Sequence, residues 1–402
     1  MYNWKSLLVC TALIIAPALH ANPLSECYPD WQQKARSLGL SKDITDSVIP
    51  GLEHLPRVLE LDRRQPEFSV SFSSYFNTRV SEQRIERGRV LIEEHRSLLN
   101  RLTQDYGVPA QYLIAFWGLE TNYGGYKGNM STLNALATLA CDPRRKDFFT
   151  TQLFDAFSLL EEHKLEPSVM VGSWAGAVGH TQFMPGNYRR FAVDGDGDGK
   201  IDLWNSIPDA LTSAANFLQS LGWQTGERWG REVRLPENFP YLELVEQRKR
   251  SLREWQKLGL TTAQGNKLPA EDMQASLVLP AGHTGPAFLV YRNFNVIMGW
   301  NRSEFYALSV GRLADRINGA GRLAVVPPEQ PRLSIAQIQA LQEKLKGLEL
   351  MDGEIDGILG PATRQAIRAF QQQQGIIPDG FPHPSLFKAL NISLDTSGEP
   401  AQ

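Results

Sequence analysis

A helix over residues 111–119 would be apolar on every side, because the run from Tyr112 to Leu119 contains no charged residue. Such a helix is stable only when other elements cover all of its faces, so it must lie at the centre of a domain built around it. Glu120 follows directly and is the only acid in residues 106–141. Burial against apolar side chains disfavours the charged form of a carboxyl, so we expect Glu120 to keep its proton near neutral pH. A general acid that cleaves a glycosidic bond needs this property. The alternative is an ordinary exposed glutamate at a helix end.

A second candidate segment, residues 173–185, is rich in glycine and free of charge, and no acid occurs in residues 167–193. Small residues let a backbone approach a ligand closely. Gln182 offers both a donor and an acceptor, and Trp174 and Phe183 offer flat faces for sugar rings. The alternative is a tightly packed turn between helices, with both aromatic rings in the core.

The N-terminus has the pattern of a secretory signal peptide. Lys5 precedes an apolar run over residues 7–19, and Ala21 is a suitable residue for cleavage. The run is too short to span a bilayer, and the alternative is a buried N-terminal helix. Neither Cys10 nor Cys27 follows the small residue that a bacterial lipoprotein signal requires. We therefore expect residues 1–21 to be removed from a soluble exported protein that carries no lipid anchor.

Export also determines how the cysteines are interpreted. Cys10 leaves with the signal peptide, so the mature chain keeps Cys27 and Cys141. Two cysteines in an oxidising compartment are most simply a disulfide, and two buried free thiols are the alternative. No Cys/His spacing typical of a zinc site occurs.

Acidic and basic residues nearly balance, since 41 Lys and Arg against 44 Asp and Glu give a net charge of −3. A chain without net positive charge is not drawn to nucleic acid or to anionic membranes, so we expect no nucleic-acid partner. The length of 402 residues predicts two or three domains.

The proline-rich segment 326–331 is the best candidate for a linker, because it is polar and incompatible with a helix. It separates a body (residues 22–325) from a small module (residues 332–392) and a short tail (residues 393–402). Apolar residues recur at helical spacing on both sides of a turn over residues 352–357, which predicts a three-helix module. The helices expected in the body cover residues 81–106, 111–119, 152–163 and 209–221. Short β-prone runs at residues 276–279 and 288–291 predict a minor sheet, so the fold class is mainly α with a small β element.

Several ordered motifs resemble one known family. Glu120-Thr-Asn-Tyr-Gly precedes Gly-Ala-x-Gly-x-x-Gln-Phe-Met-Pro, an Asp-rich loop and Trp300-Asn301-Arg302-Ser303. Together they are similar to the lytic murein transglycosylases of the membrane-bound lytic transglycosylase B type, over most of Cys27 to Leu323. The resemblance implies a lysozyme-like fold in a periplasmic protein. It also implies cleavage of the β-1,4 bond between N-acetylmuramic acid and N-acetylglucosamine to a 1,6-anhydromuramoyl product, with no cofactor for the chemistry.

The same resemblance assigns roles to residues of this chain. It places Glu120 as the single catalytic acid and base. The residues that it implies in substrate contact or support are Ser173, Gln182, Tyr123, Phe217, Trp300, Asn301 and Tyr306. Phe217 and Trp300 stand where a tyrosine is familiar in the family, so hydrogen bonds from a hydroxyl at these two positions are in doubt.

The Asp-rich loop over residues 194–202 is the strongest metal signal. Acids at alternate positions, with Gly199 at the sharp turn, match the start of an EF-hand calcium loop. Asn205 occupies the twelfth position instead of the usual glutamate, and we expect Asp209 to replace it. The predicted ligands of a structural calcium are Asp194, Asp196, Asp198, Lys200 and Asp209. The alternative is an acidic turn without a metal.

The module resembles the peptidoglycan-binding domain type 1, through Asp-Gly-x-x-Asp-Gly-x-x-Gly-Pro-x-Thr and Ala-Ile-Arg-Ala-Phe-Gln. This resemblance implies glycan strands of peptidoglycan as the partner, and proteins of wall remodelling as further partners; we expect a monomer. Two other functions stay open: a hydrolytic muramidase, and a wall-binding scaffold without activity.

Overall fold

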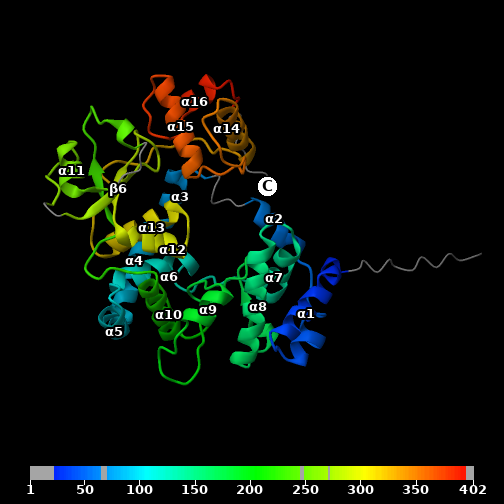
Figure 1. Ribbon diagram of the computed structural model, residues 1–402. Helices are drawn as coiled ribbons and strands as arrows, with labels where there is room; N and C mark the ends of the chain where they lie inside the picture. The colour runs from blue at the N-terminus through cyan, green and yellow to red at the C-terminus, as the bar shows by residue number, and fades with distance from the viewer. Residues whose placement is uncertain (1–21, 65–69, 245–248, 270–271, 395–402) are drawn as a thin grey trace, which may run out of the picture.

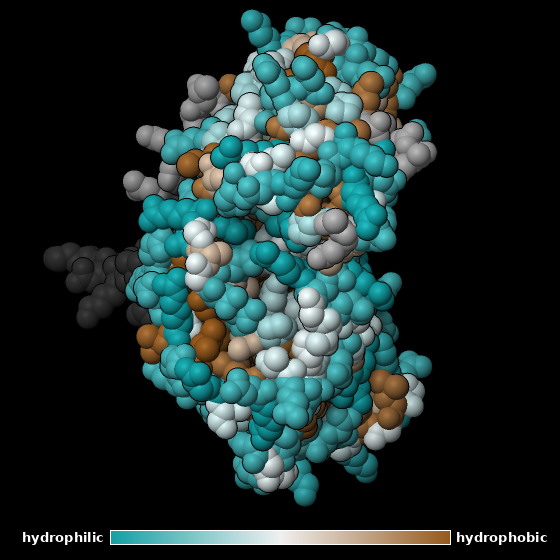
Figure 2. Space-filling view, turned by 90° about the vertical axis from the view of Figure 1, so that its left-hand side faces the viewer, coloured by the Kyte–Doolittle hydropathy of each residue, from teal (hydrophilic) through white to brown (hydrophobic). Residues whose placement is uncertain are grey.

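The computed structural model describes residues 22–64, 70–244, 249–269 and 272–394. The predicted signal peptide and most of the predicted tail lie outside these residues. Helices dominate, and a small sheet lies at one side of the body, so the predicted mainly α fold with a minor β element is confirmed (Figure 1). In the part of the chain that the structure describes, no helix has the length and apolar character needed to cross a membrane. Hydrophilic residues cover most of the face shown in Figure 2.

Helix α6 (Ala110–Thr121) lies within the first hydrophobic cluster, as its apolar run predicts, and every residue from Tyr112 to Leu119 is buried. The helices that pack against it are α4 (Glu82–Glu94), α5 (Arg96–Tyr106), α10 (Ile207–Ser220) and α13 (Glu304–Ile317). Asn122 ends α6 in the left-handed conformation, with φ of 51°. Glu120 therefore occupies the last turn of a helix that cannot move without disturbing the core.

The single helix predicted over residues 81–106 is wrong. Two helices, α4 and α5, cover this stretch, and His95 between them has non-helical angles (φ −109°, ψ 20°). No proline or glycine marks the break, so the helical periodicity continues across it in the sequence. Ser81 caps the start of α4 by accepting a hydrogen bond from the Arg84 amide.

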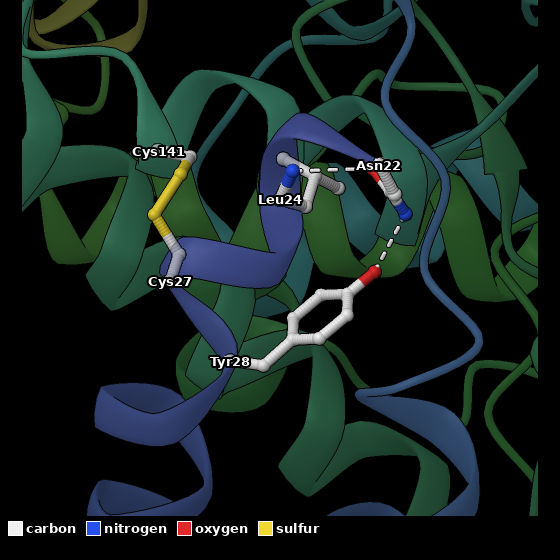
Figure 3. The surroundings of a disulfide bond; sticks show 5 residues. All are labelled: Asn22, Leu24, Cys27, Tyr28 and Cys141. Carbon is white, nitrogen blue, oxygen red and sulfur yellow. Dashed lines mark hydrogen bonds between the residues drawn. A yellow bond between two sulfur atoms is a disulfide. The ribbon is translucent and has the colours of Figure 1, made fainter. Parts of the chain in front are cut away.

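A second hydrophobic cluster lies beside the first and is also helical. Its elements are α1 (Tyr28–Ser37), α7 (Thr132–Cys141), α8 (Lys146–Glu162) and α9 (Pro185–Phe191). Cys27 and Cys141 form a disulfide that ties the N-terminal arm to the end of α7 (Figure 3). Near the disulfide, Asn22 accepts a hydrogen bond from the Leu24 amide and donates to the Tyr28 hydroxyl.

An antiparallel sheet of five strands has the order β4-β6-β7-β3-β5. Its strands are β3 (Gly230–Arg234), β4 (Arg250–Ser251), β5 (Thr261–Thr262), β6 (Gln274–Val278) and β7 (Ala287–Val290). The register pairs Glu232 with Phe288 and Leu277 with Leu289. The runs predicted at residues 276–279 and 288–291 correspond to β6 and β7. Apolar residues of these strands and of α11 (Leu252–Lys257) form a third cluster.

The C-terminal module has a hydrophobic cluster of its own, between Leu341 and Leu390. Its helices are α14 (Ile335–Gly347), α15 (Pro361–Gln373) and α16 (Pro384–Ala389), which agrees with the predicted three-helix module. Ser334 and Gln337 form a capping box at the start of α14.

The remaining elements complete the body. They are η1 (Pro23–Glu26), η2 (Ile44–Val48), α2 (Pro56–Arg64), α3 (Phe72–Arg79), β1 (Met130–Ser131), η4 (Pro167–Val169), β2 (Val171–Gly172), η5 (Tyr241–Leu244) and α12 (Arg292–Trp300).

Candidate active site

The carboxylate of Glu120 has two aromatic hydrogen-bond donors on the same oxygen. Nε1 of Trp300 donates to Oε1 over 2.9 Å, and the hydroxyl of Tyr306 donates to Oε1 over 2.5 Å. Glu120 is half-buried, whereas Tyr306 is buried. The side chains around the acid, expected to be apolar, therefore include two hydrogen-bond donors. Both donors stabilise negative charge on Oε1.

Trp300 corrects an expectation about a lost hydrogen bond. A tryptophan has no hydroxyl, yet its indole N–H supplies the donor to Glu120. The indole ring is held by Phe116, Phe217 and Phe183, whose ring centroids lie 4.6, 5.2 and 5.4 Å away. Phe217 is buried, so it supports Trp300 through its ring alone.

The start of α13 sets the position of Tyr306. Oδ1 of Asn301 accepts a hydrogen bond from the Ser303 amide, and the Ser303 side chain caps α13 by accepting from the Tyr306 amide. Tyr306 therefore lies in the first turn of α13, and packing of α13 on α6 brings its hydroxyl to Glu120. Asn301 acts on the site through this turn.

The glycine-rich segment forms tight turns beside β2. Ser173 and Ala177 pair through their backbones, and the Ser173 hydroxyl accepts a hydrogen bond from the Ala177 amide. Gly176 has a φ of 85°, and a Cβ at this position would lie 2.4 Å from a Leu136 methyl, so only glycine fits there.

Gln182 is held in the left-handed conformation, with φ of 51°, which is unfavourable for a residue other than glycine. Its Nε2 donates to the carbonyls of Lys127 (3.1 Å) and Gly179 (3.0 Å). The sequence suggests that Gln182 offers both a donor and an acceptor to a ligand. The structure uses the donor internally, so the carbonyl oxygen is the group it can offer.

Tyr123 also has an internal role. Its hydroxyl donates to the Arg84 carbonyl over 2.7 Å, and its ring packs against Trp117. A Cβ at Gly118 would lie 2.7 Å from this ring, so the glycine makes room for it. Tyr123 thus ties the loop after α6 to α4.

His180 is a residue of the site that the sequence did not single out. Its Nδ1 accepts a hydrogen bond from Nε1 of Trp117, and its carbonyl accepts one from the Thr121 hydroxyl. The same hydroxyl accepts from the Gly124 amide. His180 and Thr121 therefore join the glycine-rich segment to the end of α6. In the sequence, both residues lie within the motifs that resemble the family, and this position is the signal that could have identified them.

Three of the five predicted calcium ligands come together. Carboxylate oxygens of Asp194, Asp196 and Asp209 lie within 4.8 Å of one another. Asp209 is buried and accepts hydrogen bonds from the Gly195 and Asp202 amides, so it closes both ends of the loop.

The Asp198 carboxylate is not part of this group of three, and it accepts a hydrogen bond from the Lys200 amide. The Lys200 carbonyl stays a predicted ligand. The Gly199 amide, which donates to Asp194, holds the pKa of that carboxyl below its usual value.

Comparisons with known proteins fit this site and fold. Residues 24–315 match the family model described as "Transglycosylase SLT domain", and residues 334–390 match "Putative peptidoglycan binding domain". The chain is 31% identical over 297 residues to Membrane-bound lytic murein transglycosylase B of Escherichia coli (strain K12), covering 69% of this chain and 79% of that protein.

Two solved structures show the same likeness. SltB3 from Pseudomonas aeruginosa in complex with NAG-anhNAM-pentapeptide has 42% identity and a TM-score of 0.86, and the match covers 92% of this chain and 99% of that one. The Escherichia coli lytic transglycosylase Slt35 in complex with calcium has 29% identity and a TM-score of 0.62, with coverage of 74% and 93%.

The matched family model and the likeness to SltB3 show that the chain is a lytic transglycosylase, an enzyme that cleaves peptidoglycan. The chain belongs to the Transglycosylase SLT domain family, in the group that includes membrane-bound lytic murein transglycosylase B, and carries a C-terminal peptidoglycan-binding domain.

The environment of His180 predicts a pH dependence of stability. Burial lowers the pKa of His180 to about 4, Lys127 acts in the same direction, and Asp202 opposes them. His180 binds a proton more tightly in the unfolded chain than in the folded one. Its contribution to the free energy of unfolding is therefore complete above pH 6.5 and is lost as the pH falls toward 4. Between pH 7 and pH 5 we expect the wild type to lose about 2 kcal/mol more free energy of unfolding than His180→Gln. Urea denaturation at both pH values measures this, and equal losses would contradict it.

Proposed function

We propose that this chain cleaves the β-1,4 bond between N-acetylmuramic acid and N-acetylglucosamine and leaves a 1,6-anhydromuramoyl end. The observation that carries the proposal is the Glu120 carboxylate, whose Oε1 accepts hydrogen bonds from an indole and a phenol, in a sequence with no other acid in residues 106–141 and none in residues 167–193. Ordinary glycosidases flank the bond with two carboxylates. With one acid, the nucleophile is best supplied by the substrate itself.

The reaction has two steps. Glu120 first gives its proton to the glycosidic oxygen, the bond from C1 of the muramoyl residue to that oxygen breaks, and N-acetylglucosamine leaves with a hydroxyl. The carbonyl oxygen of the muramoyl N-acetyl group stabilises the positive charge at C1. The Glu120 carboxylate then takes the proton from the C6 hydroxyl, and O6 bonds to C1. Glu120 ends protonated, as it began, and no water is consumed.

Trp300 and Tyr306 both donate to Oε1 of Glu120. The same two bonds stabilise the carboxylate after the first step, when Glu120 must act as a base.

The remaining residues bind the substrate or support those that do. The Ser173 hydroxyl accepts from the Ala177 amide and keeps its own proton to donate to a sugar, and Gln182 offers its carbonyl oxygen. Asn301 and Phe217 hold Tyr306 and Trp300 in place, and Tyr123 holds the loop after Glu120.

The relatives support a peptidoglycan substrate. SltB3 was solved with NAG-anhNAM-pentapeptide and with NAG-NAM-pentapeptide. By this likeness the C-terminal domain binds glycan strands of the wall and raises the local substrate concentration. We propose that the enzyme acts in the periplasm after removal of residues 1–21, as a monomer, with no cofactor for the chemistry, and alongside proteins of wall remodelling.

Replacing the acid tests the function. Glu120→Gln keeps the size of the side chain and removes the transferable proton, so we expect release of muropeptides from purified sacculi to fall by roughly 10²- to 10⁴-fold. Mass spectrometry should show that the wild type releases fragments one water lighter than hydrolysis products. Glu166→Gln, an exposed change, is the matched control and should act like the wild type.

Each alternative has its own result. Reducing-end muropeptides from the wild type would establish a hydrolytic muramidase and contradict the one-carboxylate mechanism. Binding to sacculi without release of muropeptides by any of the proteins, wild type included, would indicate a wall-binding scaffold without activity.

Removing either donor to Glu120 should slow the reaction. We expect Trp300→Phe and Tyr306→Phe each to lower kcat by about 10- to 100-fold, the value of one hydrogen bond to a charged group. The double variant should lose less than the product of the two effects, because both donors act on Oε1. Trp300→Tyr replaces the indole donor with a hydroxyl donor, so its kcat should stay close to that of the wild type. Tyr126→Phe removes an exposed hydroxyl and is the control; unchanged kcat in both single variants would contradict this role.

We also propose that the Asp-rich loop holds a structural calcium, as in the Slt35 complex. The residues fit a hard cation, because three carboxylates converge and all the available ligands are oxygen atoms. The sequence motif adds Asp198 and the Lys200 carbonyl. Asp209, held by the Gly195 and Asp202 amides, takes the role of the missing glutamate.

Calcium should therefore stabilise the fold. At calcium about 100-fold above the Kd, we expect the free energy of unfolding to rise by about 2.7 kcal/mol over the EGTA-treated protein. Asp194→Asn should reduce this gain, whereas Asp352→Asn, in the turn over residues 352–357, should keep it. Chemical denaturation with and without calcium measures the gain, and an equal gain in Asp194→Asn would show that calcium binds elsewhere.

A further inference from the structure

A buried carboxylate lies where the C-terminal domain meets the body. Asp379 precedes α16 and is 1% exposed. His383, at the start of α16, brings Nε2 to 2.7 Å from Oδ2 of Asp379. His283, from the turn between β6 and β7 of the body, brings Nδ1 to 2.6 Å from the same oxygen and donates its amide to it over 2.9 Å. Two parts of the chain 96 residues apart therefore meet on one atom.

The domain contains a second copy of the motif that holds this acid, and the two copies differ. In the first copy, Gln342 donates to Oδ1 of Asp356 and accepts from the Gly357 amide. In the second copy, Gln371 makes the same bonds to Asp379 and Gly380.

The comparison separates two roles of the acid. In both copies Oδ1 of the aspartate holds the turn. Asp356, however, is exposed, whereas Oδ2 of Asp379 is buried between two imidazoles. The fold of the domain needs only Oδ1, so the histidines on Oδ2 serve something further.

We propose that His283, Asp379 and His383 form a zinc site that clamps the C-terminal domain to the body. Two imidazoles and one carboxylate are a donor set that zinc prefers, and the three ligand atoms lie within 4.8 Å of one another. The carboxylate is already oriented from behind, because Oδ1 accepts from Gln371 and from the Phe381 amide. Such outer bonds are typical of ligating carboxylates.

Ligands about 2.0–2.1 Å from a tetrahedral ion lie roughly 3.3 Å apart, so each histidine nitrogen must move about 0.6 Å from Oδ2 to admit zinc. Room exists on one side, since His383 lines a cavity of about 200 Å³ together with Thr284 and Glu329.

A glycine permits the close approach of the two domains. Gly282 has a φ of 72°, and a Cβ there would lie 2.8 Å from both Oδ2 of Asp379 and Nε2 of His383. Gln330, in the segment between body and domain, donates to the Ala281 carbonyl next to it. The clamp therefore sits where the connecting segment already touches the body, and it fixes how the wall-binding domain faces the rest of the enzyme.

Isothermal titration of the full mature chain with Zn²⁺ tests the proposal. The protein is first stripped with EDTA, and excess Ca²⁺ is present to occupy the Asp-rich loop. We expect one equivalent of tight binding, weakened by roughly 100-fold or more in His283→Gln and in His383→Gln, since even outer-shell changes cost about 10–100-fold. His54→Gln should bind like the wild type.

Two further measurements distinguish loss of the zinc site from misfolding of the variants. Circular dichroism should be the same for all variants, because His283 lies in a turn of the body and neither histidine holds Oδ1. Co²⁺ in place of Zn²⁺ should give the visible absorption of a tetrahedral site in the wild type and lose it in His283→Gln. No binding of Zn²⁺, or binding that both histidine variants keep, would overturn the proposal and leave a hydrogen-bonded contact between the domains.

Discussion

Packing of α13 against α6 is the contact on which the whole site depends. It brings the Tyr306 hydroxyl to a carboxylate 186 residues earlier in the chain, and α12 brings the Trp300 indole to the same oxygen. The contact is rigid because α6 is buried on every side, so a close-packed core holds the acid at its end. The proposed mechanism requires Glu120 to keep its geometry through two proton transfers, and this core provides it.

Several polar groups near the acid are hydrogen-bonded within the protein. His180 and Thr121 hold the loop after α6. The amide nitrogen of Gln182 donates to the backbone carbonyls of Lys127 and Gly179. Aromatic rings do the rest of the positioning, since Phe116, Phe183 and Phe217 surround Trp300.

Much of this could be predicted where the signal is local. Short β-prone runs predicted β6 and β7, helical spacing predicted the three-helix module, and the apolar run predicted the burial of α6. The break at His95 was missed because no residue there interrupts the helical pattern. The role of Trp300 was underestimated for a different reason: a donor can come from an indole as well as from a hydroxyl, and only its position shows that it reaches Glu120.

The sequence by itself determined the class of fold and the family, and it predicted Glu120 as the acid, because these depend on runs and motifs of neighbouring residues. Tertiary structure alone decided which groups meet: the donors on Oε1 of Glu120, the three acids that converge in the Asp-rich loop, and the meeting of His283 with Asp379 and His383. The physical reason is that these contacts join residues far apart in the chain. Their distances are set by how whole helices and domains pack, which no local pattern encodes.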